Sequence, residues 1–458
     1  MQTKMFSATT LSMASLLFAA QAVIQPQAPG TKTEWAMHHI DRQYWNHNSL
    51  GPGDVDRDGY TDYVVIHEGP DLYTIDFHPG KKSGDVREPW AKVVIAAGYN
   101  VEYAVFGDMD GDGNLDIVGV EGDSPKSPAG IRILWGPEPG RARDAKAWKE
   151  GELIPGTIDR GHWLYTQARD INGDGVTDII AGSRTLARNG RSAGIVWIEA
   201  PRDPKLRRDV SRWVVHDIDP TWQGGHGFIF ADINNDGHDD IVACNSDWDT
   251  TFNQKTIAWF ENPGPKSSGI ARPWKIHVIR TRMWDLYSKS QLATADFNHD
   301  GLLDVVVQTD NYVYLFEQVT GKPDTWTKIT ILKPEITRWL ARPTKIADLN
   351  GDGKPDIVGA LIHNMGFLPA GKATVFWMEF TGDQPTADNW ITHPVKWSDH
   401  SETYSSGRGE KWDHLSFIDV NGDGLIDIVG NAEEHYDKDH KSILGVVWFE
   451  SPGKSRSR

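Results

Sequence analysis

The chain has 458 residues, with 47 lysine and arginine residues against 64 aspartate and glutamate residues, and a net charge of −17. The lack of a basic stripe excludes nucleic acid as the expected partner, because nucleic-acid-binding surfaces need clustered positive charge. The single cysteine, Cys244, excludes an intramolecular disulfide, so bound metal is the expected alternative means of stabilising the fold.

The first 22 residues have the pattern of a secretory signal peptide. Lys4 is followed by an apolar stretch, which ends in small residues at Ala20 and Ala22. We therefore expect residues 1–22 to be a signal peptide, residues 23–31 to be a linker, and the mature protein to be secreted, extracellular or periplasmic. The apolar stretch is short for a membrane span, and no later segment resembles one, so no membrane span is expected.

An acidic nine-residue pattern, D-x-[DN]-x-D-G-x-x-D, recurs along the chain. It begins at Asp54, Asp108, Asp170, Asp232, Asp296, Asp348 and Asp419, so that the first aspartates are 54, 62, 62, 64, 52 and 71 residues apart. A four-stranded antiparallel unit with its turns needs about 40 to 60 residues, so each period predicts one blade of a β-propeller.

Strings typical of strands surround each acidic pattern. A short apolar run precedes it, and a run such as Asp116–Gly119 follows it. A third run ends in an aromatic and acidic corner, and a fourth begins with tryptophan at Trp213, Trp274 and Trp390. β-Branched and aromatic residues between Gly, Pro and Asp corners are typical of strands, so the repeat predicts an all-β fold.

The two ends of the chain complement each other. Residues 34–40 read as a fourth strand with no blade before it, whereas Val446–Gly453 reads as a third strand with no fourth strand after it. We therefore predict a seven-bladed β-propeller over residues 32–453, in which residues 35–40 pair with residues 446–450 and leave no free edge. Residues 454–458 are predicted to be a disordered tail.

The acidic pattern also predicts about one Ca²⁺ per blade. Side chains at positions 1, 3 and 5 converge, the glycine at position 6 allows a sharp turn, and the aspartate at position 9 closes the site. The alternative is an Asp-rich turn that needs no metal. The predicted ligands are Asp54, Asp56, Asp58 and Asp62; Asp108, Asp110, Asp112 and Asp116; Asp170, Asn172, Asp174 and Asp178; Asp232, Asn234, Asp236 and Asp240; Asp296, Asn298, Asp300 and Asp304; Asp348, Asn350, Asp352 and Asp356; and Asp419, Asn421, Asp423 and Asp427.

Calcium would also explain the composition. Seven divalent ions would bring the net charge from −17 to −3, so the acidity says little about partners. The loops that begin at Asp54 and Asp108 have aspartate at position 3, where the other five have asparagine. Because a further charged ligand strengthens calcium binding, these two loops should bind more tightly.

With these repeats the chain resembles the FG-GAP/VCBS repeat family, whose repeat forms the propellers of integrin α-chains and of many secreted proteins. The resemblance covers nearly all of the mature chain and implies the propeller fold. The family includes adhesion proteins, lectin-like modules and sugar-active enzymes. The Trp-x-Glu-x-Pro-Gly corner followed by Trp-x-x-His also resembles, more loosely, the propeller part of aldos-2-ulose (1,5-anhydrofructose) dehydratases.

A carbohydrate site is predicted on the face opposite the acidic loops, at the mouth of the central channel. The connection into the first strand of each blade pairs an aromatic residue with a polar or charged one, as a pocket for sugar rings requires. Long surface loops can also collect such residues without a ligand. The predicted substrate-binding residues are Trp45, Asn48, Tyr103, Trp163, Tyr165, Trp222, Tyr287, Trp339, Trp412 and Asp413.

The same connections contain candidates for catalysis. These candidates are His47, Glu102, His162, His226, Arg342 and His414. A histidine that faces a carboxylate and an arginine can abstract a proton next to a carbonyl while the arginine stabilises the enolate. Three histidines could instead hold Zn²⁺ at the channel mouth. The sequence thus predicts a sugar or uronide lyase or dehydratase, with a non-catalytic carbohydrate- or protein-binding (adhesion) module as the alternative.

Overall fold

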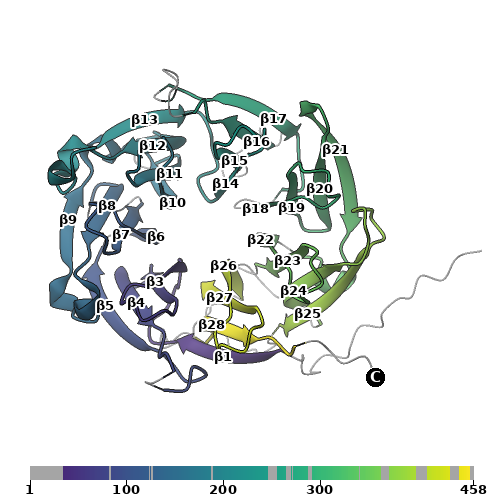
Figure 1. Cartoon of the computed structure of the whole chain (residues 1–458), viewed down its shortest axis with the longest axis horizontal. Coiled ribbons are helices and arrows are strands. Elements are labelled where there is room, and N and C mark those ends of the chain that lie inside the picture. Colours follow the sequence, from purple (N-terminus) through teal and green to yellow (C-terminus); the bar gives the residue numbers. More distant parts are fainter. Residues whose placement is uncertain are drawn as a thin grey trace, which may run out of the picture.

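The computed structural model describes residues 35–453, except 82–83, 99, 123, 125–126, 187–188, 246–254, 265–269, 271, 287–290, 340, 363–370, 399–409 and 434–442. The described residues form seven four-stranded antiparallel sheets, which are arranged as a ring of blades (Figure 1). This arrangement confirms the predicted all-β, seven-bladed propeller. The predicted signal peptide, linker and C-terminal tail lie outside the described residues.

The strands of each blade follow one another from the inside of the ring to its rim (Figure 1). Blade 1 consists of β2 (Gly51–Gly53), β3 (Asp62–His67), β4 (Leu72–Phe77) and β5 (Ala91–Ala97). Blade 2 consists of β6 (Val101–Gly107), β7 (Asp116–Glu121), β8 (Gly130–Trp135) and β9 (Lys149–Leu153). Blade 3 consists of β10 (His162–Arg169), β11 (Asp178–Arg184), β12 (Ile195–Glu199) and β13 (Val214–Asp219). Blade 4 consists of β14 (Phe228–Ala231), β15 (Asp240–Asn245), β16 (Thr256–Glu261) and β17 (Lys275–Thr281).

The remaining blades follow the same plan. Blade 5 consists of β18 (Leu292–Ala295), β19 (Asp304–Gln308), β20 (Tyr312–Val319) and β21 (Lys322–Leu332). Blade 6 consists of β22 (Ala341–Ala347), β23 (Asp356–Leu361), β24 (Ala373–Phe380) and β25 (Trp390–Trp397). Blade 7 consists of β26 (Lys411–Ile418), β27 (Asp427–Glu433), β28 (Gly445–Glu450) and β1 (Ala36–Asp41). Short 3-10 helices lie in the connections, namely η1 (Pro139–Arg141), η2 (Ala145–Ala147), η3 (Pro155–Thr157), η4 (Pro204–Leu206), η5 (Val210–Arg212) and η6 (Glu335–Thr337).

The ring is closed by the N-terminal strand, as predicted. β1 pairs antiparallel with β28, so that Ala36 lies opposite Glu450 and His39 opposite Val447. In Figure 1 the purple β1 lies on the rim beside the yellow β28. A register shift between His39 and Asp41 marks the end of this pairing. The closing strand thus supplies the fourth strand that blade 7 would otherwise lack.

The aspartate at position 9 of each acidic pattern is the first residue of the second strand of its blade. In blade 4, Asp240 accepts hydrogen bonds from the backbone N–H groups of Ile233 (3.1 Å) and Asn262 (2.8 Å). Asp240 therefore ties the acidic loop to the end of the third strand. Equivalent pairs of bonds are made by Asp62, Asp116, Asp304, Asp356 and Asp427.

The hydrophobic core consists of clusters that lie within and between neighbouring blades. Between blades 7 and 1, for example, Ile40, Tyr63, Trp90 and Trp448 belong to one buried cluster. Each blade buries both faces of its inner strands against its neighbours, which is why these strands read as continuous apolar runs. This packing leaves the loops at the two ends of the strands as the places for a functional site.

Candidate functional site

The acidic loops connect the first and second strands, whereas the connections between blades lie at the opposite ends of the first strands. In blade 1 the carboxylates of Asp54, Asp56 and Asp58 have ligand atoms within 4.8 Å of one another. In blade 2 the same holds for Asp108, Asp110 and Asp116. Three converging carboxylates form the hard oxygen donor set that calcium prefers, so the residues of these two loops fit the predicted ion.

The negative charge of these loops favours a bound cation, although neighbouring arginines already neutralise part of that charge. Burial is the main cause that raises the pKa of Asp62 to about 7, and the charge of Asp56 adds to it. Carboxyls in this state take up either a proton or a cation at neutral pH. Arg143 lies 2.9 Å from Asp56, and Arg208 donates to Asp110 over 2.5 Å. These arginines reduce the repulsion between the carboxylates.

On the opposite side of the first strands, Glu102 connects the first three blades. Its Oε1 lies 2.7 Å from Nε2 of His162, and its Oε2 accepts a hydrogen bond from the side-chain amide of Asn48 (3.3 Å). All three side chains are buried, with Glu102 9 % exposed and His162 5 % exposed. The imidazole is therefore held by a carboxylate, as in many general bases.

Blades 6 and 7 contribute buried ion pairs at the same ends of their strands. Arg342 pairs with Asp413, and its NH1 lies 4.0 Å from Glu433. Glu433 also pairs with Lys411. Arg342 is 2 % exposed and Asp413 is fully buried, so neither charge is solvated. The sequence had indicated Arg342 and Asp413, but not their partner Glu433, which ends a strand of apolar pattern.

His414 links these two groups. Its ring centroid lies 4.7 Å from that of Tyr103 and 6.4 Å from that of Tyr165. Gln291 donates to the backbone carbonyl of Asp413 (3.0 Å) and lies 3.5 Å from Nδ1 of His414. Burial, followed by the charge of Arg342, holds the pKa of His414 well below its ordinary value. We refer to these residues as the channel-mouth cluster: Asn48, Glu102, Tyr103, His162, Tyr165, Gln291, Arg342, Asp413, His414 and Glu433.

Several predicted substrate-binding residues lie elsewhere. The rings of Trp163, Trp222 and Trp412 are buried in the hydrophobic core, at 0 to 4 % exposure, so they offer no free surface to a sugar. Trp339 packs against the core of blades 5 and 6, and Trp45 lies against Gly69. The predicted Tyr287 lies outside the described residues. Whether a side chain enters the core depends on the direction in which it points. The spacing of residues along the sequence did not reveal that direction.

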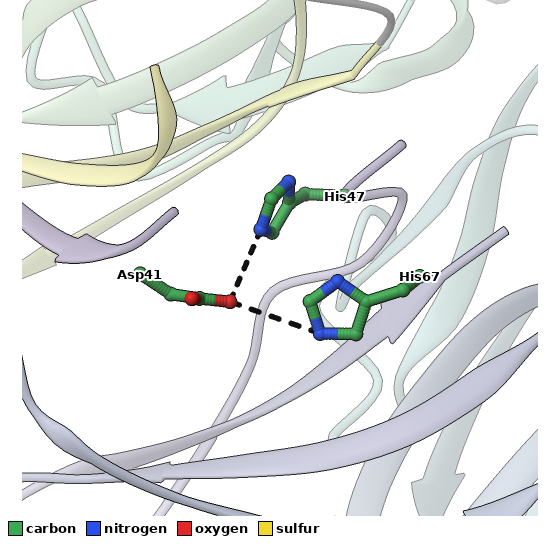
Figure 2. A group of neighbouring side chains, drawn as sticks. All are labelled: Asp41, His47 and His67. Carbon is green, nitrogen blue, oxygen red and sulfur yellow. Dashed lines mark hydrogen bonds and ion pairs between the residues drawn. The ribbon is translucent and has the colours of Figure 1, made fainter. Parts of the chain in front are cut away.

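Two of the predicted catalytic histidines also lie apart from the interactions described above. His226, in the connection into β14, is 6 % exposed. His47 turns its ring toward Asp41 and His67, and the three form a separate buried group (Figure 2). Among the residues that the structure describes, the predicted histidines do not form a three-histidine group close enough to share one zinc ion.

Residues 54–119, 108–181 and 296–359 match the FG-GAP-like repeat family. No curated protein matches the chain. Among solved structures, BBS1N in complex with ARL6DN is similar over 93 % of this chain and 99 % of that chain, at 9 % identity, with TM-scores of 0.52 for the lead soak and 0.50 for the mercury soak. A lectin from Agrocybe aegerita that recognises non-reducing terminal N-acetylglucosamine is similar over 88 % of this chain and 99 % of that chain, at 15 % identity and a TM-score of 0.46.

The fold and the repeats define the class of this protein as a seven-bladed β-propeller. More particularly, three segments of this propeller match the FG-GAP-like repeat, and the fold suits a binding or an enzymatic module. FG-GAP-like repeats are typical of extracellular proteins. The described part of the chain contains no helix with the length and apolar character that crossing a membrane would need.

Proposed function

We propose that the channel mouth of this propeller binds carbohydrate and catalyses an elimination reaction on it, as a sugar or uronide lyase or dehydratase. The observation that carries the proposal is the hydrogen bond between His162 of β10 and Glu102 of β6, the two strands that also contain Tyr165 and Tyr103. A carboxylate that orients an imidazole favours proton abstraction, and the partly exposed ring of Tyr165 suits the C–H face of a sugar ring.

The elimination requires a base and a group that stabilises the negative charge that develops. His162 is the base in this proposal. Its Nε2–H donates to the carboxylate of Glu102, so Nδ1 is the nitrogen that accepts the proton next to a carbonyl or carboxylate. Arg342 is the positively charged hydrogen-bond donor of the cluster. It would have to contact the substrate while it also pairs with Asp413. An arginine near a developing enolate lowers the barrier through electrostatic stabilisation.

A non-catalytic binding module is the second candidate, and a different observation favours it. The charges of Arg342, Asp413, Glu433 and Lys411 are buried and paired with one another. A network that is already satisfied can serve to hold the inner ends of the blades in place. In that case the cluster shapes a platform, and the ligand is bound without being transformed.

The proposal also includes secretion and calcium binding. The apolar N-terminal stretch that follows Lys4 supports a signal peptide. The converging carboxylates of Asp54, Asp56 and Asp58 support calcium in the acidic loops. Bound calcium would hold the loops at the far ends of the strands and leave the channel mouth free for the ligand.

Turnover and binding assays on the same protein separate the candidates. Uronides, anhydrosugars and keto-sugars are offered, and product is followed by the ultraviolet absorbance of an unsaturated or enone product. We expect wild-type turnover, which Glu102→Gln and His162→Gln abolish while both variants remain folded. His216→Gln, a histidine of the rim of blade 3 that bonds to Glu199, is the matched control and should retain turnover.

The other outcomes are also informative. Carbohydrate binding by calorimetry without any turnover would support the binding module and reject the lyase. Turnover that persists in both Glu102→Gln and His162→Gln would place the reaction elsewhere. Neither binding nor turnover with any sugar class would reject carbohydrate as the ligand.

A further inference from the structure

The group of Asp41, His47 and His67 lies at the seam where the ring is closed. Asp41 is the last residue of β1, the strand that completes blade 7. His67 ends β3 of blade 1, and His47 lies in the connection between β1 and β2 and pairs with His67 through an isolated β-bridge. The seam has no covalent link, since the only cysteine of the chain is Cys244 in blade 4.

The three side chains present ligand atoms to a common point (Figure 2). Nε2 of His47 lies 3.1 Å from Oδ2 of Asp41, and Nε2 of His67 lies 3.8 Å from the same oxygen. Two ligands of a tetrahedral zinc ion, each about 2.0 to 2.1 Å from the metal, are about 3.3 Å apart. The observed separations lie on either side of that value. Small shifts of the side chains would therefore admit an ion.

The group is built into the interior and not spread over the surface. His47 and His67 are fully buried, and Asp41 is 4 % exposed. Nδ1 of each imidazole is buried and has no hydrogen-bond partner among the described residues. Tyr44 covers the group, with its ring centroid 5.0 Å from that of His67. Two imidazoles and a carboxylate in such a shielded place are the donor set of many zinc sites.

Two groups compete with an ion. Nε2 of His67 lies 2.9 Å from the hydroxyl oxygen of Thr74, and the ammonium group of Lys92 pairs with Asp41. Nζ of Lys92 also lies 3.8 Å from Oδ1 of Asp76, a buried carboxylate whose two oxygens have no hydrogen-bond partner among the described residues. Two buried carboxylates thus face a single ammonium group. If Lys92 moves to Asp76, Asp41 becomes free for a cation and both carboxylates are then neutralised.

We propose that Asp41, His47 and His67 form a binding site for zinc or a similar first-row divalent cation, which clamps the closing strand β1 to blade 1. Water supplies the fourth ligand. The site is distinct from the acidic loops, whose ligands are all oxygen atoms, and from a zinc site of the channel-mouth histidines, because it uses Asp41 and His67. It does not depend on the carbohydrate function.

Zinc binding to the whole protein tests the proposal. The protein is stripped with a chelator and saturated with Ca²⁺, so that the acidic loops do not take zinc, and ZnCl₂ is then titrated by equilibrium dialysis. We expect one tight equivalent per chain, and at least about 100-fold weaker binding in His67→Gln and His47→Gln. The matched control is His38→Gln, which removes a β1 histidine bonded to Glu450 and should leave the equivalent intact.

Cobalt gives an independent reading of the ligands. Co²⁺ in the site should show the intense visible absorption of tetrahedral coordination, and this absorption should be lost in His67→Gln. Octahedral oxygen sites give only weak bands. The absence of a tight zinc equivalent in the wild type, or its persistence in both histidine variants, would overturn the proposal.

Lys92→Met distinguishes a metal site from an ion-pair network. Without Lys92 no ammonium group competes for Asp41, so zinc should bind more tightly and should raise the melting temperature of the variant by several degrees. If Lys92 and Asp41 form only an ion pair, the variant loses stability and zinc fails to restore it. That second result would reject the clamp.

Discussion

At the scale of single residues, the buried charged groups have the largest expected effects. Lys333 follows β21, is fully buried and donates a hydrogen bond to the backbone carbonyl of Thr309 (2.9 Å). Burial lowers the pKa of Lys333 to about 7 from an ordinary value of 10.5, and Asp310 opposes this shift only in part. The folded protein therefore holds this lysine largely uncharged in mildly alkaline solution.

Lys333 should make the stability depend on pH. Between about pH 7 and 10.5 the unfolded chain binds a proton that the folded protein has released, so the free energy of unfolding rises with pH. Relative to Lys333→Met, the wild type should gain up to about 1.4 kcal/mol per pH unit in this range, and nothing below about pH 6. Urea denaturation of both proteins across this range measures the difference. A difference that is constant with pH would contradict the shift.

Arg342 and Asp413 should behave as a buried pair. Arg342→Met leaves the carboxylate of Asp413 uncompensated in the interior, which should cost about 3 to 5 kcal/mol. The double variant Arg342→Met/Asp413→Leu leaves no such charge and should cost less than the single variant. Denaturant unfolding measures both free energies. The control is Arg160→Met, which removes a half-exposed pair with Asp217 and should cost about 0 to 1 kcal/mol of stability. Equal losses in the single and double variants would show that the pair is not coupled.

At the scale of elements, the acidic loop has two separable roles. The aspartate at position 9 accepts backbone N–H groups and fixes the start of the second strand, as Asp304 does with Phe297 and Gln318. The residues at positions 1, 3 and 5 are more exposed and would provide the oxygens for the predicted ion. The first role needs no metal, because both partners in each bond are protein groups.

Calcium should therefore stabilise the protein through positions 1, 3 and 5. Chelation should lower the melting temperature by several degrees, because an ion bound only to the folded state stabilises it by mass action. In calcium, Asp110→Ala should cost more than Asn421→Ala, since it removes a charged ligand. In excess chelator this difference should shrink to the contribution of the pair with Arg208, which Arg208→Met measures separately. An unchanged melt in chelator would reject calcium.

The outer strands carry a second repeated device. Trp197, Trp259 and Trp377 of the third strands stack on His216, His277 and His393 of the fourth, with ring centroids 3.9 to 4.4 Å apart. Each of these histidines also bonds to the glutamate of the Trp-x-Glu corner, at 2.6 to 2.9 Å. The recurring Trp, Glu and His residues thus pin the rim strand to its blade.

At the scale of the whole molecule, stability depends on closure of the ring. Removal of residues 1–41 would leave β28 as an open edge in blade 7, and an exposed edge strand favours aggregation. We expect this truncation to melt at a much lower temperature and to aggregate, as measured by calorimetry and light scattering. A truncation that begins at Trp35 retains β1 and serves as the control. Equal melting temperatures for the two would show that β1 does not close the ring.

The sequence predicted the architecture because each blade repeats the same local pattern. The spacing from Asp54 to Asp419 gave the number of blades, and the unmatched strings at the two ends gave their pairing, which β1 and β28 confirm. Strand strings and acidic loops are local features, so they can be recognised in the sequence without knowledge of which residues meet in space. The same pattern predicted the convergence of Asp54, Asp56 and Asp58.

The candidate sites were only partly predictable. Glu102, His162, Arg342 and Asp413 were indicated by their position before the acidic loops, but their pairing across blades was not. Trp163 follows His162 directly and was assigned to the same surface, yet its ring is in the core, because successive residues of a strand point to opposite faces.

What the sequence alone determined is therefore the repeat: an all-β ring of seven blades with acidic loops, closed by its first strand. The tertiary structure decided which polar side chains meet. Asp41 belongs to blade 7 and His67 to blade 1, and neither lies in a recognisable motif, so only closure of the ring brings them to His47. Contacts between blades depend on side-chain direction and on the angle between sheets, and a repeat pattern carries no information about either.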